Sequence, residues 1–201
     1  MTNLPFTFKL VFFTTIICLS KNYAYAQPSK SGWPDQKNQV IGTIEIPKIQ
    51  EMHLSDYLEK HGNPLSEEAL LAFEEKHNLT LPDALKIILS YSNGCSAINR
   101  TIDMGKNMPE YFTDFFSLEW IEASIQNIKS IEAEFHYYFS DVLLPIGDAG
   151  GVRYLCIGLA GTYKNNIYII DYQSYDYKDI NSMLTYIGPS IEDLFYRLKP
   201  N

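Results

Sequence analysis

The order of two hydrophobic periodicities along the chain constrains its fold most strongly. In the first part, apolar residues recur at steps of three and four, which is typical of helices that bury one face. In the last third, β-branched and aromatic runs alternate with glycine-containing breaks, which is typical of strands joined by hairpin turns. Helices followed by an antiparallel meander favour an α+β protein and not the strand-helix alternation of a parallel sheet.

The individual elements follow from these patterns and from the turn residues between them. The expected helices are residues 55–62, 66–78, 82–93, 119–139 and 189–198. The expected strands are residues 142–146, 152–159 and 167–170. Between the first two strands, Gly150-Gly151 fits a turn that needs positive φ.

Residues 1–26 differ in composition from the rest of the chain and are expected to be a signal peptide. Lys9 is the only charge before the apolar run Leu10–Leu19, which is too short to anchor stably in a bilayer. Ala24-Tyr25-Ala26 is the small-x-small pattern of a cleavage site, which makes Gln27 the new N-terminus. The alternative is a buried N-terminal element of the fold. We therefore expect export to the periplasm, with no membrane anchor after cleavage.

The rest of the chain divides into a leader and a domain. Residues 27–50 begin as a polar, proline-containing stretch, so we expect a flexible leader there and one domain over residues 51–201. The formal charge of -8 becomes -10 when residues 1–26 are removed, because they carry Lys9, Lys21 and no acid. This acidity disfavours nucleic acid and anionic membrane surfaces as partners, and it is compatible with a basic partner.

Two cysteines, Cys95 and Cys156, remain after cleavage. A disulfide between them would suit an oxidising compartment and would stabilise the fold by about 4 kcal/mol in the chain-entropy model. The alternative is two small, buried, free thiols. The sequence leaves both alternatives open, because it does not place the two residues in space.

The chain carries none of the motifs that would indicate catalysis: no Gly-x-Ser-x-Gly elbow, no phosphate-binding loop and no paired helical histidines with an intervening Glu. Glu132, Glu134 and His136 resemble metal ligands only superficially, because residues two apart on a helix face different ways. A solvated helix face is the better interpretation. We therefore expect no catalytic residue, no metal and no cofactor.

One segment has the composition of a protein-binding loop. Between residues 171 and 179 it combines rigid tyrosine side chains with carboxylates that could pair with Arg or Lys. The predicted partner-binding residues are Asp171, Tyr172, Tyr175, Asp176, Tyr177 and Asp179. In the alternative, alternate tyrosines of an extended strand point into the core.

Several motifs in this order resemble those of the SUKH superfamily of Smi/Knr-like domains. They are LSEEALLAFEEKHNLTLPDALKIILSYSNGC from Leu65 to Cys95, then Phe116-Ser117-Leu118-Glu119, Leu144-Pro145-Ile146-Gly147-Asp148, Tyr154-Leu155-Cys156, Ile167–Asp171 and Ile187–Leu194. The resemblance covers about Ser55 to Leu198. The chain departs from the pattern at Val152-Arg153, where the family often has Gly-Asp.

The resemblance implies an α+β, SUKH-like fold, with a mixed, mainly antiparallel sheet and flanking helices, and a function in binding. Most bacterial members are thought to be immunity proteins, so it implies a cognate protein toxin as the partner. Combined with a signal peptide, it implies a toxin that acts in the cell envelope. The competing hypotheses are a scaffold for cell-wall assembly, or an envelope module with enzymatic activity or a glycan-binding cleft. The aromatic residues expected to line such a cleft are Tyr111, Phe112, Phe115, Tyr137 and Tyr138.

Overall fold

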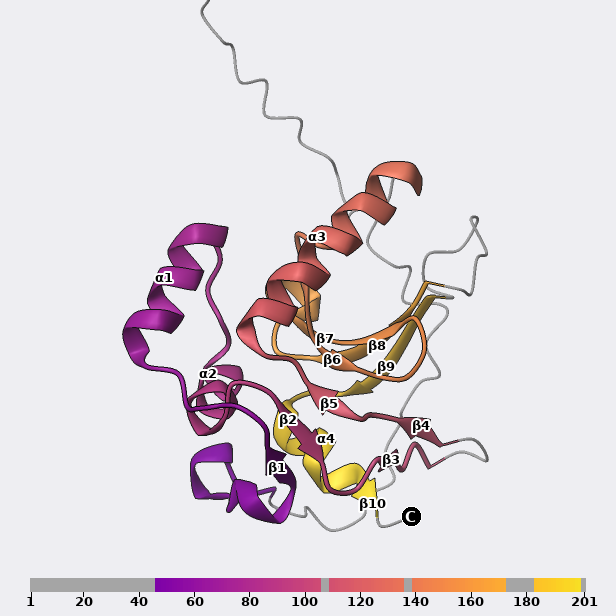
Figure 1. Ribbon diagram of the computed structural model, residues 1–201. Helices are drawn as coiled ribbons and strands as arrows, with labels where there is room; N and C mark the ends of the chain where they lie inside the picture. Colours follow the sequence, from indigo (N-terminus) through magenta and orange to yellow (C-terminus); the bar gives the residue numbers. More distant parts are fainter. Residues whose placement is uncertain (1–45, 106–108, 136–138, 173–182, 200–201) are drawn as a thin grey trace, which may run out of the picture. The chain divides into compact units, whose positions relative to one another are not determined.

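A seven-stranded sheet organises the fold of the computed structural model (Figure 1), which describes residues 46–105, 109–135, 139–172 and 183–199. These residues belong to one compact unit, residues 38–201. The strand order is β1-β2-β5-β6-β7-β8-β9, and each neighbouring pair is antiparallel. The strands are β1 (Leu58–Lys60), β2 (Cys95–Ala97), β5 (Asp114–Phe115), β6 (Leu143–Asp148), β7 (Arg153–Gly158), β8 (Ile167–Asp171) and β9 (Leu184–Gly188).

A second sheet of three short strands joins two distant parts of the chain. Its order is β10-β3-β4, and both pairings are antiparallel. Leu198 pairs with Ile102, which is fully buried. The strands are β3 (Thr101–Ile102), β4 (Glu110–Tyr111) and β10 (Leu198–Lys199).

The helices begin and end where local capping residues favour it. Ser66 Oγ accepts a hydrogen bond from the backbone N–H of Ala69 at 3.3 Å, and Asn78 closes the same helix in the left-handed conformation with φ 50°. None of the helices among the described residues is both long and apolar enough to cross a bilayer. They are α1 (Glu67–His77), α2 (Asp83–Tyr91), α3 (Leu118–Phe135) and α4 (Ile191–Arg197), with 3-10 turns at Ile49–Glu51, Leu54–Asp56 and Gly161–Tyr163.

Successive side chains of β8 point to opposite faces of the sheet, so they belong to two separate parts of the core. Tyr168 packs in a smaller cluster with Ile128 of α3. The next residue, Ile169, belongs to the larger cluster, which contains Leu194 of α4. Figure 1 accordingly shows α3 above the strands and α4 below them.

The α+β class expected from the sequence is confirmed, and so are four of the five expected helices and all three expected strands. Gly150 and Gly151 have φ of 86° and 71°, as the expected turn requires. The prediction of a helix over residues 55–62 is wrong, because Leu58–Lys60 pairs with β2. The third long helix ends at Phe135 rather than at residue 139. The strands β1 to β5 and β10 are missing from the expectation, because two or three residues leave little periodicity, and β9 is missing as well.

The predicted leader extends too far along the chain. Ile49 lies within the segment 27–50 but is only 2% exposed and belongs to the larger core cluster. Its backbone N–H donates to Glu192 Oε1 of α4 at 3.2 Å. The folded domain therefore begins before residue 51.

Candidate functional site

The predicted Tyr/Asp segment is described only at its start. Tyr172 is 4% exposed and packs against Tyr154 with ring centroids 6.1 Å apart, so it belongs to the core. Its assignment to a partner-binding surface is therefore wrong, because its ring is removed from solvent. Asp171 is half-buried opposite Arg153. Tyr175, Asp176, Tyr177 and Asp179 lie outside the described residues, so their role stays a prediction.

The structure decides between the two alternatives for the cysteines. Cys95 and Cys156 are both free and buried. They lie on β2 and β7, three strand spacings or about 14 Å apart, which is beyond the reach of a disulfide. The disulfide alternative is therefore wrong. Burial and the neighbouring Asp114 raise the pKa of Cys95 to about 12, so this thiol stays protonated.

Glu132 does not lie on the solvated face expected for it. It is 2% exposed, and its carboxylate accepts hydrogen bonds from the backbone N–H groups of Phe139 and Ser140. Burial raises the pKa of Glu132. His136 lies outside the described residues, and among those described no group of three His, Cys, Asp or Glu could hold a metal.

The described aromatic residues of the glycan hypothesis, Tyr111, Phe112 and Phe115, do not lie together at one exposed site. Phe112 and Phe115 are 0% and 2% exposed, and their rings pack edge to face in the core, 4.7 Å apart. Tyr111 is exposed, on the small second sheet. Tyr137 and Tyr138 lie outside the described residues. Both phenylalanines therefore belong to the core, although Phe115 also borders the cleft described below.

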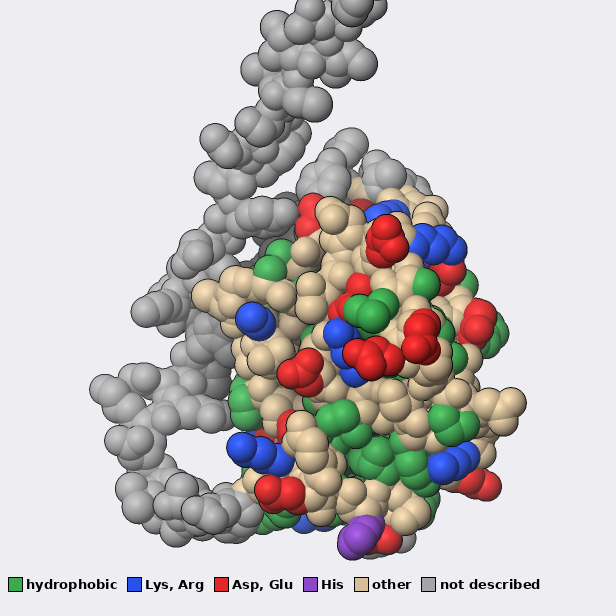
Figure 2. Space-filling view, turned by 90° about the vertical axis from the view of Figure 1, so that its left-hand side faces the viewer, with side chains coloured by type: hydrophobic (Ala, Val, Ile, Leu, Met, Phe, Trp, Pro, Cys, Tyr) green, Lys and Arg blue, Asp and Glu red, His purple; other side chains and the backbone are tan. Residues whose placement is uncertain are grey.

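The acidic residues of α1 also do not form a distinct site. On the face of the molecule that carries α1, acidic side chains are interspersed with basic ones (Figure 2). Glu74, for example, pairs with Lys86 of α2 at 2.8 Å. This face has the mixed charge of an ordinary solvated surface.

A cleft of about 490 Å³ lies between the start of α3 and the β1-β2-β5-β6 part of the sheet. It combines ionisable, polar and aromatic side chains, which is typical of binding sites. Its lining residues are His61, Gly62, Asn93, Gly94, Asp114, Phe115, Phe116, Ser117, Trp120 and Asp148.

Three polar side chains form a row across neighbouring strands at this cleft. Ser96 of β2 pairs with Asp114 of β5, and Asp114 pairs with Asp148 of β6. Directly paired residues point to the same face of a sheet, with Cβ atoms about 5 Å apart. The two carboxylates therefore lie side by side.

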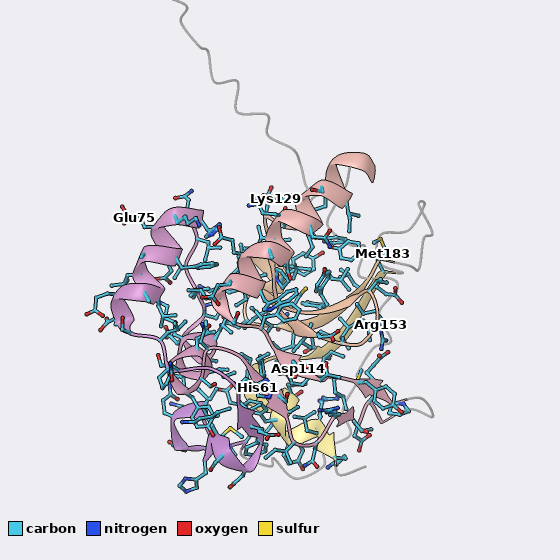
Figure 3. The ribbon with its side chains drawn as sticks, in the orientation of Figure 1. His61, Glu75, Asp114, Lys129, Arg153 and Met183 are labelled. Carbon is cyan, nitrogen blue, oxygen red and sulfur yellow. The ribbon has the colours of Figure 1, made fainter. Side chains whose placement is uncertain are left out.

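A chain of hydrogen bonds connects His61 to this row. Figure 3 shows His61 and Asp114, the two ends of this chain, near each other. Ser96 Oγ donates its single proton to Asp114 Oδ1, so it accepts from His61 Nε2 at 3.0 Å. His61 consequently carries a proton on Nε2. In a catalytic triad the histidine stands between the serine and the acid, whereas here the serine stands between them. The arrangement positions Asp114 and does not activate a nucleophile.

Buried hydrogen bonds hold the rim of the cleft in place. Ser92, which is fully buried, accepts from the backbone N–H of Gly62 at 3.2 Å and donates to Gly94 O at 2.6 Å. Asn93 Oδ1 accepts from the N–H of Leu118, the first residue of α3, at 2.7 Å. Gly94 itself has φ 91°, a conformation that favours glycine. These contacts tie the loop after α2 to the start of α3.

An exposed tryptophan and a third carboxylate stand at the same end of α3. Trp120 is 65% exposed, and its ring centroid lies 6.4 Å from that of Phe116. Glu119 accepts a hydrogen bond from Asn93 Nδ2 at 3.2 Å. Hydrogen bonds from Ser117, from its own backbone and from Asn93 hold the pKa of Glu119 below its usual range. The accessible indole ring thus borders the same cleft as Asp114 and Asp148, and the negatively charged Glu119 precedes it in the chain.

A larger cavity of about 650 Å³ lies near the starts of α2 and α4. It combines Lys164 with Asp83 and Glu192, and Glu192 is already bonded to the N–H of Ile49. This cavity indicates no single ligand chemistry, because it contains both signs of charge and because Glu192 already accepts a hydrogen bond within the protein.

Sequence reasoning missed His61, Asp114, Trp120 and Asp148 as site residues. The sequence offered only weak signals: Asp114 precedes the buried Phe115, and Asp148 lies just before the Gly150-Gly151 turn. The pairing of β5 with β6, which brings the two carboxylates together, cannot be read from these signals. Arg153, where the chain departs from the family pattern, has a structural role. Its guanidinium group donates a hydrogen bond to Ala149 O at 2.7 Å across the turn.

The structure thus defines an α+β protein with a cleft that is lined by His61, Asp114, Asp148 and exposed Trp120. The sequence model of the SMI1/KNR4 family (SUKH-1) matches residues 64–197, and the chain belongs to this family. Proteins with this domain are commonly toxin-immunity proteins, and SMI1/KNR4 also relates to cell-wall synthesis. A search of curated proteins found no significant match.

Proposed function

We propose that the protein is an immunity protein that binds and neutralises a secreted antibacterial toxin acting in the cell envelope. The observation that carries the proposal is the cleft in which Asp114 and Asp148 stand beside exposed Trp120. Paired carboxylates with an accessible aromatic ring suit a protein partner that has a basic surface. Such an immunity protein acts stoichiometrically, by covering the toxin's active site or holding it inactive, and needs no catalytic residue or cofactor of its own.

The proposed place of action is the periplasm. Residues 1–26 have the charge, the apolar run and the Ala24-Tyr25-Ala26 pattern of a cleaved signal peptide. N-terminal sequencing of the mature protein from a periplasmic fraction should begin at Gln27. A cytoplasmic protein that begins at residue 1 or 2 would contradict the proposal.

Co-expression with the toxin encoded by the neighbouring gene tests the function directly. Cells that export both proteins should survive, whereas cells whose chain lacks residues 2–26 should die. The periplasmic toxin alone should kill. Absence of protection by the exported full chain would overturn the proposal.

The predicted loop residues can be tested in the same assay. Tyr175→Ala and Asp176→Lys should weaken toxin binding while leaving the unfolding midpoint unchanged, because the charge reversal opposes a basic partner. Unchanged affinity in both variants would remove this segment from the interface.

A scaffold for cell-wall assembly is the second candidate, because SMI1/KNR4 relates to cell-wall synthesis. The two functions differ in a strain that lacks the toxin. Deleting the gene for this protein in the toxin-free strain should leave growth and cell shape unchanged if the protein serves only immunity. An envelope defect in that strain would favour the scaffold.

A further inference from the structure

We infer that the cleft beside Trp120 binds the guanidinium group of an arginine side chain presented by a partner protein. The inference deepens the proposed function and rests on it, because it takes the occupant to be part of a protein. Two features of the described residues support it. The carboxylates of Asp114 and Asp148 are cross-strand neighbours that form no ion pair with a described residue, and the exposed indole ring of Trp120 lines the same cleft.

The two carboxylates repel each other in the free protein. Asp114 and Asp148 are direct cross-strand partners, and like charges in such positions are destabilising. Among the ion pairs of the described residues, none includes either carboxylate. Arg153, which follows Asp148 across the turn, pairs instead with Glu110 at 2.8 Å. A cation supplied from outside would therefore relieve a repulsion that the fold maintains.

The indole ring of Trp120 selects among cations. A tryptophan that is 65% exposed loses the hydrophobic benefit of burial, which a partner's side chain could restore. Guanidinium groups stack on aromatic faces and donate several hydrogen bonds in one plane. One guanidinium could thus contact the indole ring and the carboxylates of Asp114 and Asp148 together.

Other occupants fit the cleft less well. His61, Asp114 and Asp148 do not form a group that could hold a metal, and the described residues contain no such group. A lysine ammonium is a compact charge without the planar fork that matches two carboxylates. An anion is opposed by Glu119 as well as by the two aspartates.

The fluorescence of Trp120 gives a direct test in the full chain. The chain has two tryptophans, so Trp33→Phe leaves Trp120 as the only reporter. N-acetyl-L-arginine amide should change its emission saturably, with a dissociation constant on the order of 1 mM. The neutral isostere N-acetyl-L-citrulline amide should leave the emission unchanged.

Asp148→Asn tests the carboxylate, because its amide oxygen can still accept the Gly150 N–H that Asp148 Oδ1 accepts at 2.8 Å. It should weaken arginine binding at least tenfold. Glu75→Gln is the matched control: it removes one charge from an exposed position of α1, away from the cleft (Figure 3), and should leave the affinity unchanged.

Equal binding of citrulline, tighter binding of N-acetyl-L-lysine amide, or the same emission change with magnesium chloride alone would overturn the assignment. If the arginine probe binds but co-expression gives no protection, the immunity function fails and the cleft remains a guanidinium site. If the probe does not bind and Asp148→Asn protects as well as the original chain, the cleft assignment fails and the immunity function stands.

Discussion

Glu132, near the end of α3, holds the segment just before β6 through Ser140. Its carboxylate accepts hydrogen bonds from the Ser140 N–H at 2.8 Å and from Ser140 Oγ at 2.6 Å. A buried carboxylate with several donors stabilises a loop locally but makes the fold sensitive to its protonation. This relationship leads to a prediction about pH.

Burial raises the pKa of Glu132 above that of the unfolded chain, so the folded state holds the proton more tightly. This contribution to stability is complete below about pH 4 and is lost as the pH rises through the raised pKa. The free energy of unfolding of the wild type, relative to that of Glu132→Gln, should therefore fall as the pH rises from about 4 through the raised pKa of Glu132. Urea unfolding at several pH values measures it; a constant difference would contradict the prediction.

Glu132→Ala separates the hydrogen bonds from the charge. It leaves the buried N–H groups of Phe139 and Ser140 without their acceptor, so it should destabilise the fold by about 3 kcal/mol. Glu132→Gln, which keeps an acceptor oxygen, should cost much less at neutral pH.

Cys95 and Cys156 should stay reduced in the mature protein even in an oxidising compartment, because their strands hold them apart. Burial raises the pKa of both thiols, which keeps them in the unreactive protonated form. Iodoacetamide should modify neither thiol in the native protein and both after denaturation without reductant. A peptide that links the two cysteines would contradict this prediction.

Tyr172→Phe should stabilise the protein by about 1 kcal/mol, because the buried hydroxyl of Tyr172 has no hydrogen-bond partner among the described residues. Tyr168→Phe is the matched control, since it removes a hydroxyl that accepts from Asn166 Nδ2 at 3.3 Å. Thermal unfolding should place the first variant above the second. Destabilisation by Tyr172→Phe would instead indicate a bonded hydroxyl.

Ser92→Ala should destabilise the fold by about 2 kcal/mol and weaken binding of the arginine probe, because Ser92 anchors the loop that carries His61. Ser55→Ala, at an exposed position, should change stability by less than about 0.5 kcal/mol. Unchanged probe affinity in Ser92→Ala would show that the rim of the cleft does not depend on this residue.

The sequence by itself determined the elements whose signals are local. Ser66 and Asn78 mark the ends of α1, and the spacing of Ile121, Ile125 and Ile128 gives the buried stripe of α3, because capping and helical periodicity act within a few residues. The long apolar runs of β6, β7 and β8 are recognisable for the same reason. The α+β class and the family followed from the order of these elements.

Only the tertiary structure decided which distant residues meet. Asp114 and Asp148 become neighbours because β5 pairs with β6, and His61 joins them through Ser96, yet no local pattern encodes these pairings. The same physical reason explains the burial of Tyr172 and Glu132, whose polar surroundings in the sequence suggested solvent. Strand register and packing, rather than composition, placed the carboxylates beside Trp120 and separated Cys95 from Cys156.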